Sequence, residues 1–213
     1  MTGDSTHGPP AVPGGRAEAI LRTERMVLRR LTEADVDLLV ELDADPAVMR
    51  FLTGGRPTPR DVVRGRILPA MLTASDRGDV LGYWAAFTHT ADDSRIDGEF
   101  LGWFELRATD VVGEAELGYR LRRRAWGVGH ATEGAAALIR LGFERAGLRR
   151  VFATTMAVNL ASRRVLAKAG LTLFRTFHED FDDPIDGAEH GEVEYALTRS
   201  DWERYGGAGH VDR

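Results

Sequence analysis

Hydrophobic and polar positions predict a strand followed by a helix near the start of the chain. The run Met26–Leu31 has the length and apolar character of a short strand. Thr32 is then expected to begin a helix, with Asp35 in the reciprocal position of a capping box. The apolar face of this helix contains three leucines: Leu38, Leu39 and Leu42. Pro46 is expected to end it, because proline cannot continue a helix interior.

A second helical region and three strands are predicted in the next part of the chain. Apolar residues recur at helical spacing from Pro57 to Ser75, with an interruption or kink expected at Pro69. Three aromatic-rich β segments follow: Leu81–Thr88, Phe100–Leu106 and Ala115–Leu121. Their polar connections, such as Ala91–Arg95, are too short for parallel crossovers. We therefore expect an antiparallel meander.

The segment Arg122–Phe143 joins a glycine-containing loop to a helical pattern. One face of the predicted helix carries small and apolar residues: Ala131, Ala135, Leu138, Ile139, Gly142 and Phe143. Gly127 and Gly129 lie directly before this helix. A helix N-terminus presents backbone N–H groups that have no intrahelical acceptor, and it carries partial positive charge. The junction is therefore suited to bind a phosphate.

The rest of the chain predicts a strand, a short helix and two further strands. Arg150–Ala157 follows the strand and helix before it, so a right-handed crossover should place it parallel to Ala115–Leu121. Asn159 is a suitable N-cap for a helix over Leu160–Ala169, with Gly170 as its left-handed stop. The last strands are expected at Leu171–Phe177 and Val193–Leu197. The sheet thus changes from antiparallel to parallel at the glycine loop.

Length and composition indicate a single domain of mixed type. The chain has 213 residues, of which 43% are hydrophobic, enough for one sizeable core. We expect the domain over residues 21–205, between flexible tails at 1–20 and 206–213, with a loose end from Trp202 on. The first residues lack the continuous apolar core of a secretory signal, and no run is long enough to span a membrane. A cytoplasmic protein without a membrane partner is the expectation.

Charge and cysteine content exclude further classes. The formal charge of −5 argues against a nucleic-acid partner. The chain has no cysteine, so disulfides, thiolate metal sites and cysteine nucleophiles are excluded. The six histidines show no metal-ligand spacing, and no metal is expected.

The spacing of the glycines distinguishes three kinds of phosphate loop. A P-loop requires Lys and then Ser or Thr after its last glycine, but Gly129 is followed by His130. A dinucleotide fingerprint requires a third glycine where Thr132 stands. The run Arg124–Gly129 instead matches Arg/Gln-x-x-Gly-x-Gly/Ala, the loop that holds the acetyl-CoA pyrophosphate in GCN5-related N-acetyltransferases. An ordinary turn from strand to helix remains the alternative for this loop taken alone.

The chain resembles the GCN5-related N-acetyltransferase (GNAT) family, and within it the ribosomal-protein N-terminal (alanine/serine) acetyltransferase branch. Several runs carry the resemblance: Leu28–Thr32 with Asp35, Glu116–Tyr119, Trp126–Glu133, Asn159–Ser162, and Val165–Leu166 with Lys168 and Gly170–Leu171. The order of the predicted elements is also that of the family. The resemblance implies an α/β (α+β) single domain, with a mixed six- to seven-stranded sheet, about four flanking helices and two splayed central strands.

The resemblance also implies an acetyl-CoA site. The pantetheine arm would lie between the strands Ala115–Leu121 and Arg150–Ala157, and the pyrophosphate would rest on backbone N–H groups of the glycine loop. The residues expected to bind the cofactor are Leu121, Arg124, Ala125, Trp126, Gly127, Val128, Gly129, His130, Ala131, Thr132 and Asn159. A Cβ at the loop glycines would hold the phosphate away from these donors.

The candidate catalytic residues are Ser162 and Glu116. Many family members use a tyrosine seven residues after the asparagine as the acid for the leaving thiolate, but that position is Leu166 here. Ser162, one helical turn beyond Asn159, could direct its hydroxyl to the sulfur instead. Glu116 is the candidate base, acting through water, and Glu114 shares its face of the strand. Each could alternatively be an ordinary solvated side chain.

The function that the resemblance implies is direct transfer of an acetyl group from acetyl-CoA to a primary amine in a ternary complex. A protein or peptide N-terminus is the first candidate acceptor, and a small amine such as a polyamine or aminoglycoside is the second. A non-catalytic acyl-CoA-binding module and a nucleotide-binding domain are alternatives from other classes. The acidic loop Glu179–Glu189 could attract a cationic acceptor. A homodimer is possible through an exposed sheet edge.

Overall fold

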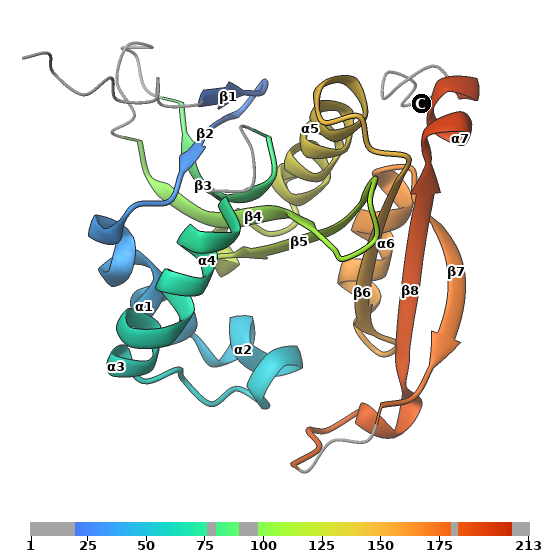
Figure 1. The fold of residues 1–213 in the computed structure, drawn as a ribbon. Helices are drawn as coiled ribbons and strands as arrows, with labels where there is room; N and C mark the ends of the chain where they lie inside the picture. Colours follow the sequence, from blue (N-terminus) through green and yellow to red (C-terminus); the bar gives the residue numbers. More distant parts are fainter. Residues whose placement is uncertain (1–19, 76–79, 90–97, 180–182, 206–213) are drawn as a thin grey trace, which may run out of the picture.

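The computed structural model describes residues 20–75, 80–89, 98–179 and 183–205. Within them, eight strands form one sheet in the order β1-β2-β3-β4-β5-β6-β8-β7 (Figure 1). The strands are β1 (Ile20–Arg22), β2 (Met26–Arg30), β3 (Gly82–Thr88), β4 (Phe100–Ala108), β5 (Glu114–Leu121), β6 (Arg150–Met156), β7 (Thr172–Phe177) and β8 (Glu192–Thr198). Residues 1–19, 206–213 and the turn Ala91–Arg95, about which the sequence made predictions, lie outside the described residues.

The predicted fold class is confirmed, with one strand more than expected. β2, β3, β4 and β5 form the antiparallel meander, and β5 and β6 are parallel. The additional strand is β1, which pairs antiparallel with β2 from Ile20 opposite Arg29 to Arg22 opposite Val27. Ile20 had been assigned to the N-terminal tail. A three-residue strand is too short to show alternation, so its pairing partner defines it.

The helices are more numerous than the four expected. They are α1 (Val36–Asp43), α2 (Pro46–Thr53), α3 (Arg60–Val62), α4 (Leu68–Ser75), α5 (His130–Arg145), α6 (Leu160–Lys168) and α7 (Arg199–Arg204). α1 ends before Pro46, but Pro46 also begins α2, which the sequence analysis missed. Proline fits the first helical position because its missing N–H would have no acceptor there. Asp45 caps this helix by accepting a hydrogen bond of 2.9 Å from the backbone N of Ala47.

Two predictions about helices need correction in detail. The interruption expected at Pro69 is a π-helical turn over Val63–Ile67, in which the backbone N of Leu68 donates to the carbonyl of Val63. This wider turn lies immediately before the proline, which has no N–H to donate. The chain end from Trp202 is not loose throughout, because α7 includes Trp202. Its indole ring packs on Phe143 of α5 with the ring centroids 5.4 Å apart.

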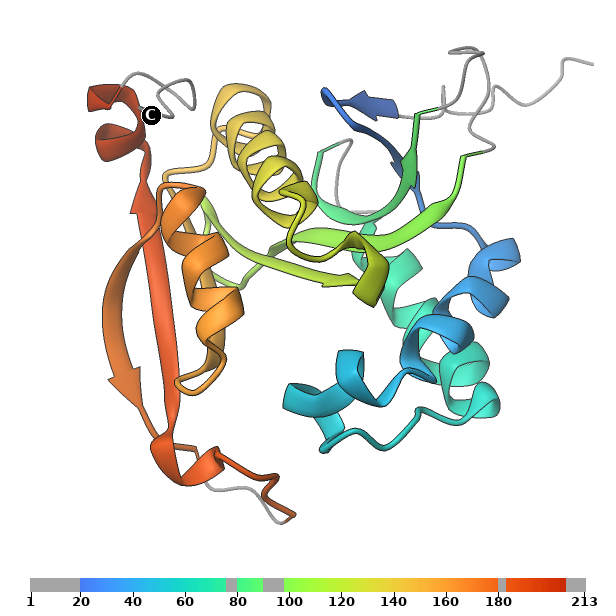
Figure 2. The same cartoon turned by 180° about the vertical axis from the view of Figure 1, so that it is seen from behind.

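The helices cover different parts of the two faces of the sheet (Figures 1 and 2). α5 and α6 cover one face, where buried residues of β4, β5 and β6 meet buried residues of these helices: Phe104, Leu117, Val151, Leu138, Phe143 and Leu166. α1, α3 and α4 cover the other face over β2, β3 and β4, with a second core that includes Leu39, Leu42, Leu68, Met71, Ala85 and Phe100. We call these the α5–α6 face and the α1–α4 face.

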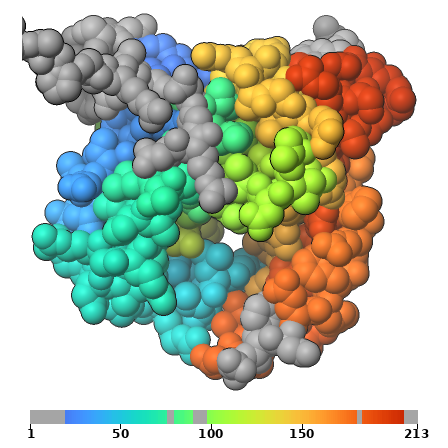
Figure 3. All heavy atoms as spheres, viewed as in Figure 1, coloured from blue at the N-terminus to red at the C-terminus, as the bar shows by residue number. Residues whose placement is uncertain are grey.

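The predicted separation of the two central strands is present. β5 and β6 pair only where Glu114–Glu116 lie beside Arg150–Phe152. Beyond that point β5 still pairs with β4 as far as Leu121, while β6 pairs with β8 as far as Met156. Figure 3 shows an opening through the molecule below β5, bordered by the α2 region and by the half of the sheet that contains β6, β7 and β8.

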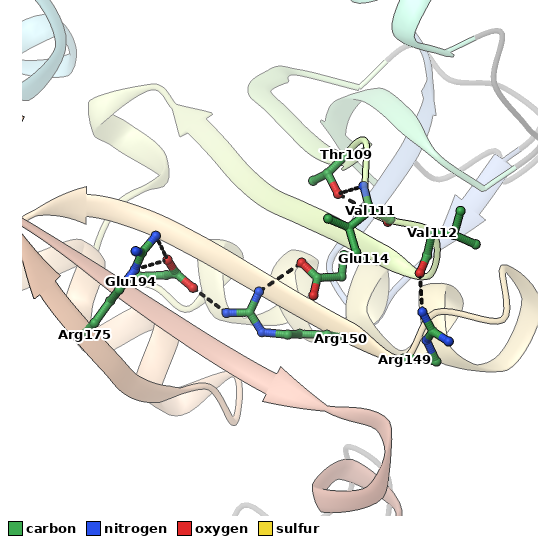
Figure 4. A network of polar contacts seen from close by, with 8 residues as sticks. All are labelled: Thr109, Val111, Val112, Glu114, Arg149, Arg150, Arg175 and Glu194. Atoms are coloured by element: carbon green, nitrogen blue, oxygen red, sulfur yellow. Dashed lines mark hydrogen bonds and ion pairs between the residues drawn. The ribbon is translucent and has the colours of Figure 1, made fainter.

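An arginine joins the strands at the closed end of this separation (Figure 4). Arg150 on β6 donates a 3.1 Å hydrogen bond to Glu114 on β5 and forms an ion pair with Glu194 on β8. The Glu194 side chain is only 5% exposed, and its other oxygen accepts a 2.7 Å hydrogen bond from Arg175 on β7. Four strands are thus connected through two carboxylates.

Replacement of Arg150 should destabilise the fold. Arg150→Met leaves Glu194 buried with only an exposed partner, so we expect the free energy of unfolding to fall by about 3 kcal/mol. Arg175→Met is the matched control, because Arg175 contacts the same carboxylate but its side chain is 58% exposed. Its loss should cost about 1 kcal/mol or less. Urea unfolding followed by circular dichroism measures both, and equal losses would contradict the assigned role of Arg150.

Candidate functional site

The glycine loop has the backbone conformation that its sequence requires. Gly127 has φ of +74° and Gly129 has φ of +95°, both in the left-handed region that favours glycine. Gly129 is the N-cap of α5, so the amides of His130, Ala131 and Thr132 have no intrahelical acceptor. The loop therefore offers backbone donors at the open end of the β5–β6 separation, as a pyrophosphate site requires.

The side chains of the loop mainly fix its path. The Trp126 indole N–H donates a 2.8 Å hydrogen bond to the carbonyl of Leu121 and ties the loop to the end of β5. Leu121 and Ala125 have buried side chains, whereas Val128 is half exposed. Arg124 is 2.5 Å from Glu99 and half exposed, so part of its charge is already engaged within the protein. These contacts agree with a site built chiefly from backbone.

Arg25, which the sequence analysis did not identify, supports the loop from the turn before β2. Its guanidinium donates 2.5 Å to the carbonyl of Val128 and 2.6 Å to Glu133 in the first turn of α5, and its backbone N donates 2.8 Å to the same carboxylate. Burial alone would raise the pKa of Glu133. Hydrogen bonds from Thr23 and Arg25, together with the Arg25 charge, outweigh burial and hold this pKa below its usual value.

Asn159 caps α6, as predicted. Its side-chain oxygen accepts a 3.2 Å hydrogen bond from the backbone N of Ser162, and its amide donates 3.2 Å to Thr155 at the end of β6. Gly170, with φ of +95°, follows the helix as the predicted left-handed residue. The cap places the start of α6 beside the separated part of β6.

Ser162 has a partner that the sequence analysis missed. The Tyr119 hydroxyl on β5 lies 3.0 Å from the Ser162 hydroxyl, and either group could donate. Burial raises the pKa of Tyr119 to about 12, with only partial opposition from its hydrogen bond to Ser162, so the phenol is neutral at physiological pH. Leu166, the position of the absent tyrosine, is buried in the core. Tyr119 therefore supplies a phenol hydroxyl next to Ser162 from a different element.

Glu116 and Ser162 lie on opposite faces of the sheet. Alternation along β5 directs Glu116 to the α1–α4 face and Tyr119 to the α5–α6 face. Glu116 forms an ion pair with Arg107 on β4, whose guanidinium is also 3.3 Å from Glu105. Glu105 was not predicted as a site residue. It lies opposite Gly118, where a Cβ would collide with its carboxylate.

The acidic loop approaches the end of α2. Asp183 is 2.7 Å from Arg56, and both side chains are exposed. A hollow of about 240 Å³ lies where the two segments meet, lined by Arg50, Thr53, Gly54, Arg56, Pro184, Ile185 and Asp186. Residues 183–186 of the predicted loop therefore lie beside the end of α2, where Asp183 is already paired with Arg56. Residues 180–182 of the loop lie outside the described residues.

Comparison with known proteins decides the family. Residues 25–172 match the sequence profile of the acetyltransferase (GNAT) domain. The chain belongs to this family. The resemblance found in the sequence is therefore confirmed: the protein is a GNAT-type N-acetyltransferase, and acetyl-CoA is its acyl donor.

Individual relatives fit this assignment. The chain is 34% identical over 197 residues to the FsC-acetyl coenzyme A-N(2)-transacetylase of Aspergillus fumigatus. The aligned region covers 89% of this chain and 80% of that protein. Among solved structures, the ribosomal L7/L12 alpha-N-protein acetyltransferase RimL with coenzyme A has a TM-score of 0.70 at 21% identity, over 84% of this GNAT chain and 97% of RimL. The spermidine N-acetyltransferase of Vibrio cholerae with CoA and spermine has a TM-score of 0.65 at 14% identity, over 84% and 98%. The two solved structures show a shared fold.

Among the described residues, no group of three or more His, Asp or Glu side chains is placed to hold a metal ion. In the same part of the chain, no helix combines the length and apolarity needed to cross a bilayer.

Proposed function

We propose that this GNAT protein transfers the acetyl group of acetyl-CoA directly to a primary amine in a ternary complex. The observation that carries the proposal is the arrangement around the separated part of β5. The glycine loop stands at its open end, the Tyr119–Ser162 pair stands on its α5–α6 face, and carboxylates stand on its α1–α4 face. A thioester held between β5 and β6 would thus have proton-transfer groups on both sides.

The residues divide the chemistry of the transfer. Backbone N–H groups of the glycine loop bind the pyrophosphate, and Asn159 is available to contact the pantetheine arm. A carboxylate on the α1–α4 face removes a proton from the incoming ammonium, the role for which the sequence nominates Glu116. The free amine attacks the thioester carbonyl, whose developing negative charge is stabilised by donors on the separated edge of β5. Ser162, whose hydroxyl is paired with that of Tyr119, then donates a hydrogen bond to the leaving sulfur.

We favour a small amine as the acceptor. The observation behind this choice is the 34% identity to the A. fumigatus enzyme, whose name places the transferred acetyl group on an N(2) nitrogen of FsC. A protein or peptide N-terminus is the second candidate, supported by the fold shared with RimL. The opening in Figure 3 would admit either class from the α1–α4 side.

An acceptor screen tests the proposal. The chain has no cysteine, so release of CoA thiol is measured without background from the protein. We expect thiol release with small primary amines such as n-butylamine, spermidine or kanamycin to exceed that with peptides carrying N-terminal Ala or Ser. The same peptides with a blocked N-terminus are the control. The reverse order would favour the protein N-terminus, and acetyl-CoA binding without turnover for every amine would indicate a non-catalytic module.

A further inference from the structure

Four polar side chains form a cluster on the α1–α4 face that the sequence analysis did not connect. Tyr83 on β3 lies opposite Glu105 on β4, and Arg107 on β4 lies opposite Glu116 on β5. Interaction with the Tyr83 hydroxyl lowers the pKa of the Glu105 carboxyl and partly opposes the effect of its burial. We call Tyr83, Glu105, Arg107 and Glu116 the β3–β5 cluster.

The β3–β5 cluster carries one more negative than positive charge. Arg107 forms its ion pair with Glu116 and lies 3.3 Å from one oxygen of Glu105. That oxygen is buried, and the Arg107 guanidinium is the cation beside it among the described residues. From the covering helices, Asp43 on α1 faces the sheet but is paired with Arg120, and α4 contains no charged residue. One guanidinium therefore serves two carboxylates.

A buried and incompletely compensated carboxylate favours either a proton or a second cation. The Glu105 side chain is 13% exposed. Burial raises its pKa, Glu116 raises it further, and Tyr83 and Arg107 oppose this rise only in part. An ammonium group placed against Glu105 would supply the missing positive charge, and its proton would find an acceptor of suitable basicity.

The position of Glu105 relates it to the reaction. Its carboxylate lies over Gly118, in the part of β5 that has separated from β6. A Cβ at Gly118 would meet this carboxylate unless the Glu105 side chain shifted. The next residue, Tyr119, points to the other face and reaches Ser162. Glu105, suited to accept a proton, thus lies on the α1–α4 face at Gly118. Ser162, suited to donate one, lies on the α5–α6 face at the neighbouring Tyr119.

We propose that Glu105 binds the acceptor's ammonium group and takes its proton, while Glu116 holds Arg107 in place. This assignment rests on the proposed amine acetylation. The N–H bond of the ammonium breaks and its proton passes to the Glu105 carboxylate. The freed electron pair forms the bond to the acetyl carbon. As the carbon–sulfur bond breaks, the nitrogen gives up its second proton and the leaving thiolate gains one through Ser162, so that a neutral amide and the CoA thiol are the products. Glu105 afterwards returns its proton to solvent.

Kinetics of Glu105→Gln test the assignment directly. The variant keeps the shape but not the charge, and we expect kcat/KM for the acceptor to fall about 100-fold, the usual contribution of a general base. Acetyl-CoA affinity should not change. Glu116→Gln should lose less, because Glu116 only positions Arg107. Asp37→Asn, which removes an exposed charge from α1, is the control for long-range charge. Wild-type kcat/KM in Glu105→Gln, or a larger loss in Glu116→Gln, would overturn the proposal.

The pH dependence separates a proton acceptor from a structural residue. The acidic limb of the kcat/KM profile should follow ionisation of Glu105 in the wild type and should disappear in Glu105→Gln. Stability provides a readout without turnover. Between the ordinary glutamate pKa and the raised one, the folded protein binds more protons than the unfolded chain, so stability falls as pH rises. Glu105→Gln should lack this fall and should be the more stable protein at pH 8.

A binding measurement keeps this test independent of the unknown acceptor. At pH 8, n-butylammonium chloride should raise the Tm of the wild type by about 2 °C or more relative to sodium chloride of equal ionic strength, and should leave Glu105→Gln unchanged. Equal shifts in both proteins would overturn the ammonium site. If no amine in the screen is acetylated while this difference is present, the proposed function fails and the ammonium site stands.

Discussion

Gly129→Val is expected to weaken acetyl-CoA binding about 100-fold or more, whereas Arg124→Ala should weaken it about threefold at most. Gly129 has φ of +95°, a conformation that costs a β-branched residue about 1–3 kcal/mol. Its Cβ would also lie 3.0 Å from the Arg25 guanidinium that holds the loop. The loop must change its path, and the backbone donors for the pyrophosphate change with it. A hundredfold loss corresponds to about 2.7 kcal/mol.

The comparison requires a control for backbone strain alone. Gly147 after α5 also has a positive φ, of +65°, and a Cβ there would meet no atom within 4 Å. Gly147→Val should therefore lower stability without changing acetyl-CoA affinity. Calorimetric titration of the three variants with acetyl-CoA measures the series. A larger loss in Arg124→Ala than in Gly129→Val would show that side-chain charge, rather than backbone, binds the pyrophosphate.

The sequence predicted those parts of the fold that follow from local pattern. The strands β2 to β5 are apolar or aromatic-rich runs bounded by polar turns, and the sequence places them within two residues at each end. The Asn159 cap and the parallel crossover after α5 follow from local chemistry and chain handedness. β1 and α7 were missed because β1 depends on pairing with β2, and because Trp202 of α7 packs on Phe143 from a distant helix. Pro46 was misjudged because proline can both end one helix and begin the next.

In the candidate site, too, features set by local sequence were predicted and features set by contacts between distant residues were not. The glycine loop is continuous in sequence, so its spacing was sufficient to identify it. Arg25 and Glu133 are 108 positions apart, and Tyr119 and Ser162 are 43 apart. Only the alternation along β5, which directs Tyr119 away from Glu116, could have suggested the second pair. No local pattern relates Glu105 to Gly118, because that contact depends on the register between β4 and β5.

Ser162→Ala is expected to lower kcat about 100-fold while acetyl-CoA affinity stays near the wild-type value. The hydroxyl is proposed to act only after the amine has attacked, when negative charge develops on the sulfur. Its loss should therefore affect turnover more than binding of the ground state. Single-turnover kinetics with a saturating acceptor, together with calorimetric titration of acetyl-CoA, separate the two quantities. A large loss of acetyl-CoA affinity would show that Ser162 serves binding instead.

The partner variant Tyr119→Phe decides which hydroxyl faces the sulfur. With its pKa raised to about 12, Tyr119 stays protonated and can donate to Ser162, which directs the serine proton toward the leaving group. Tyr119→Phe should then cost about tenfold in kcat. The double variant should be no slower than Ser162→Ala, because residues that act through one another are not additive. If the two losses multiply instead, Tyr119 reaches the sulfur independently, and the phenol takes the role of the tyrosine that is absent at Leu166.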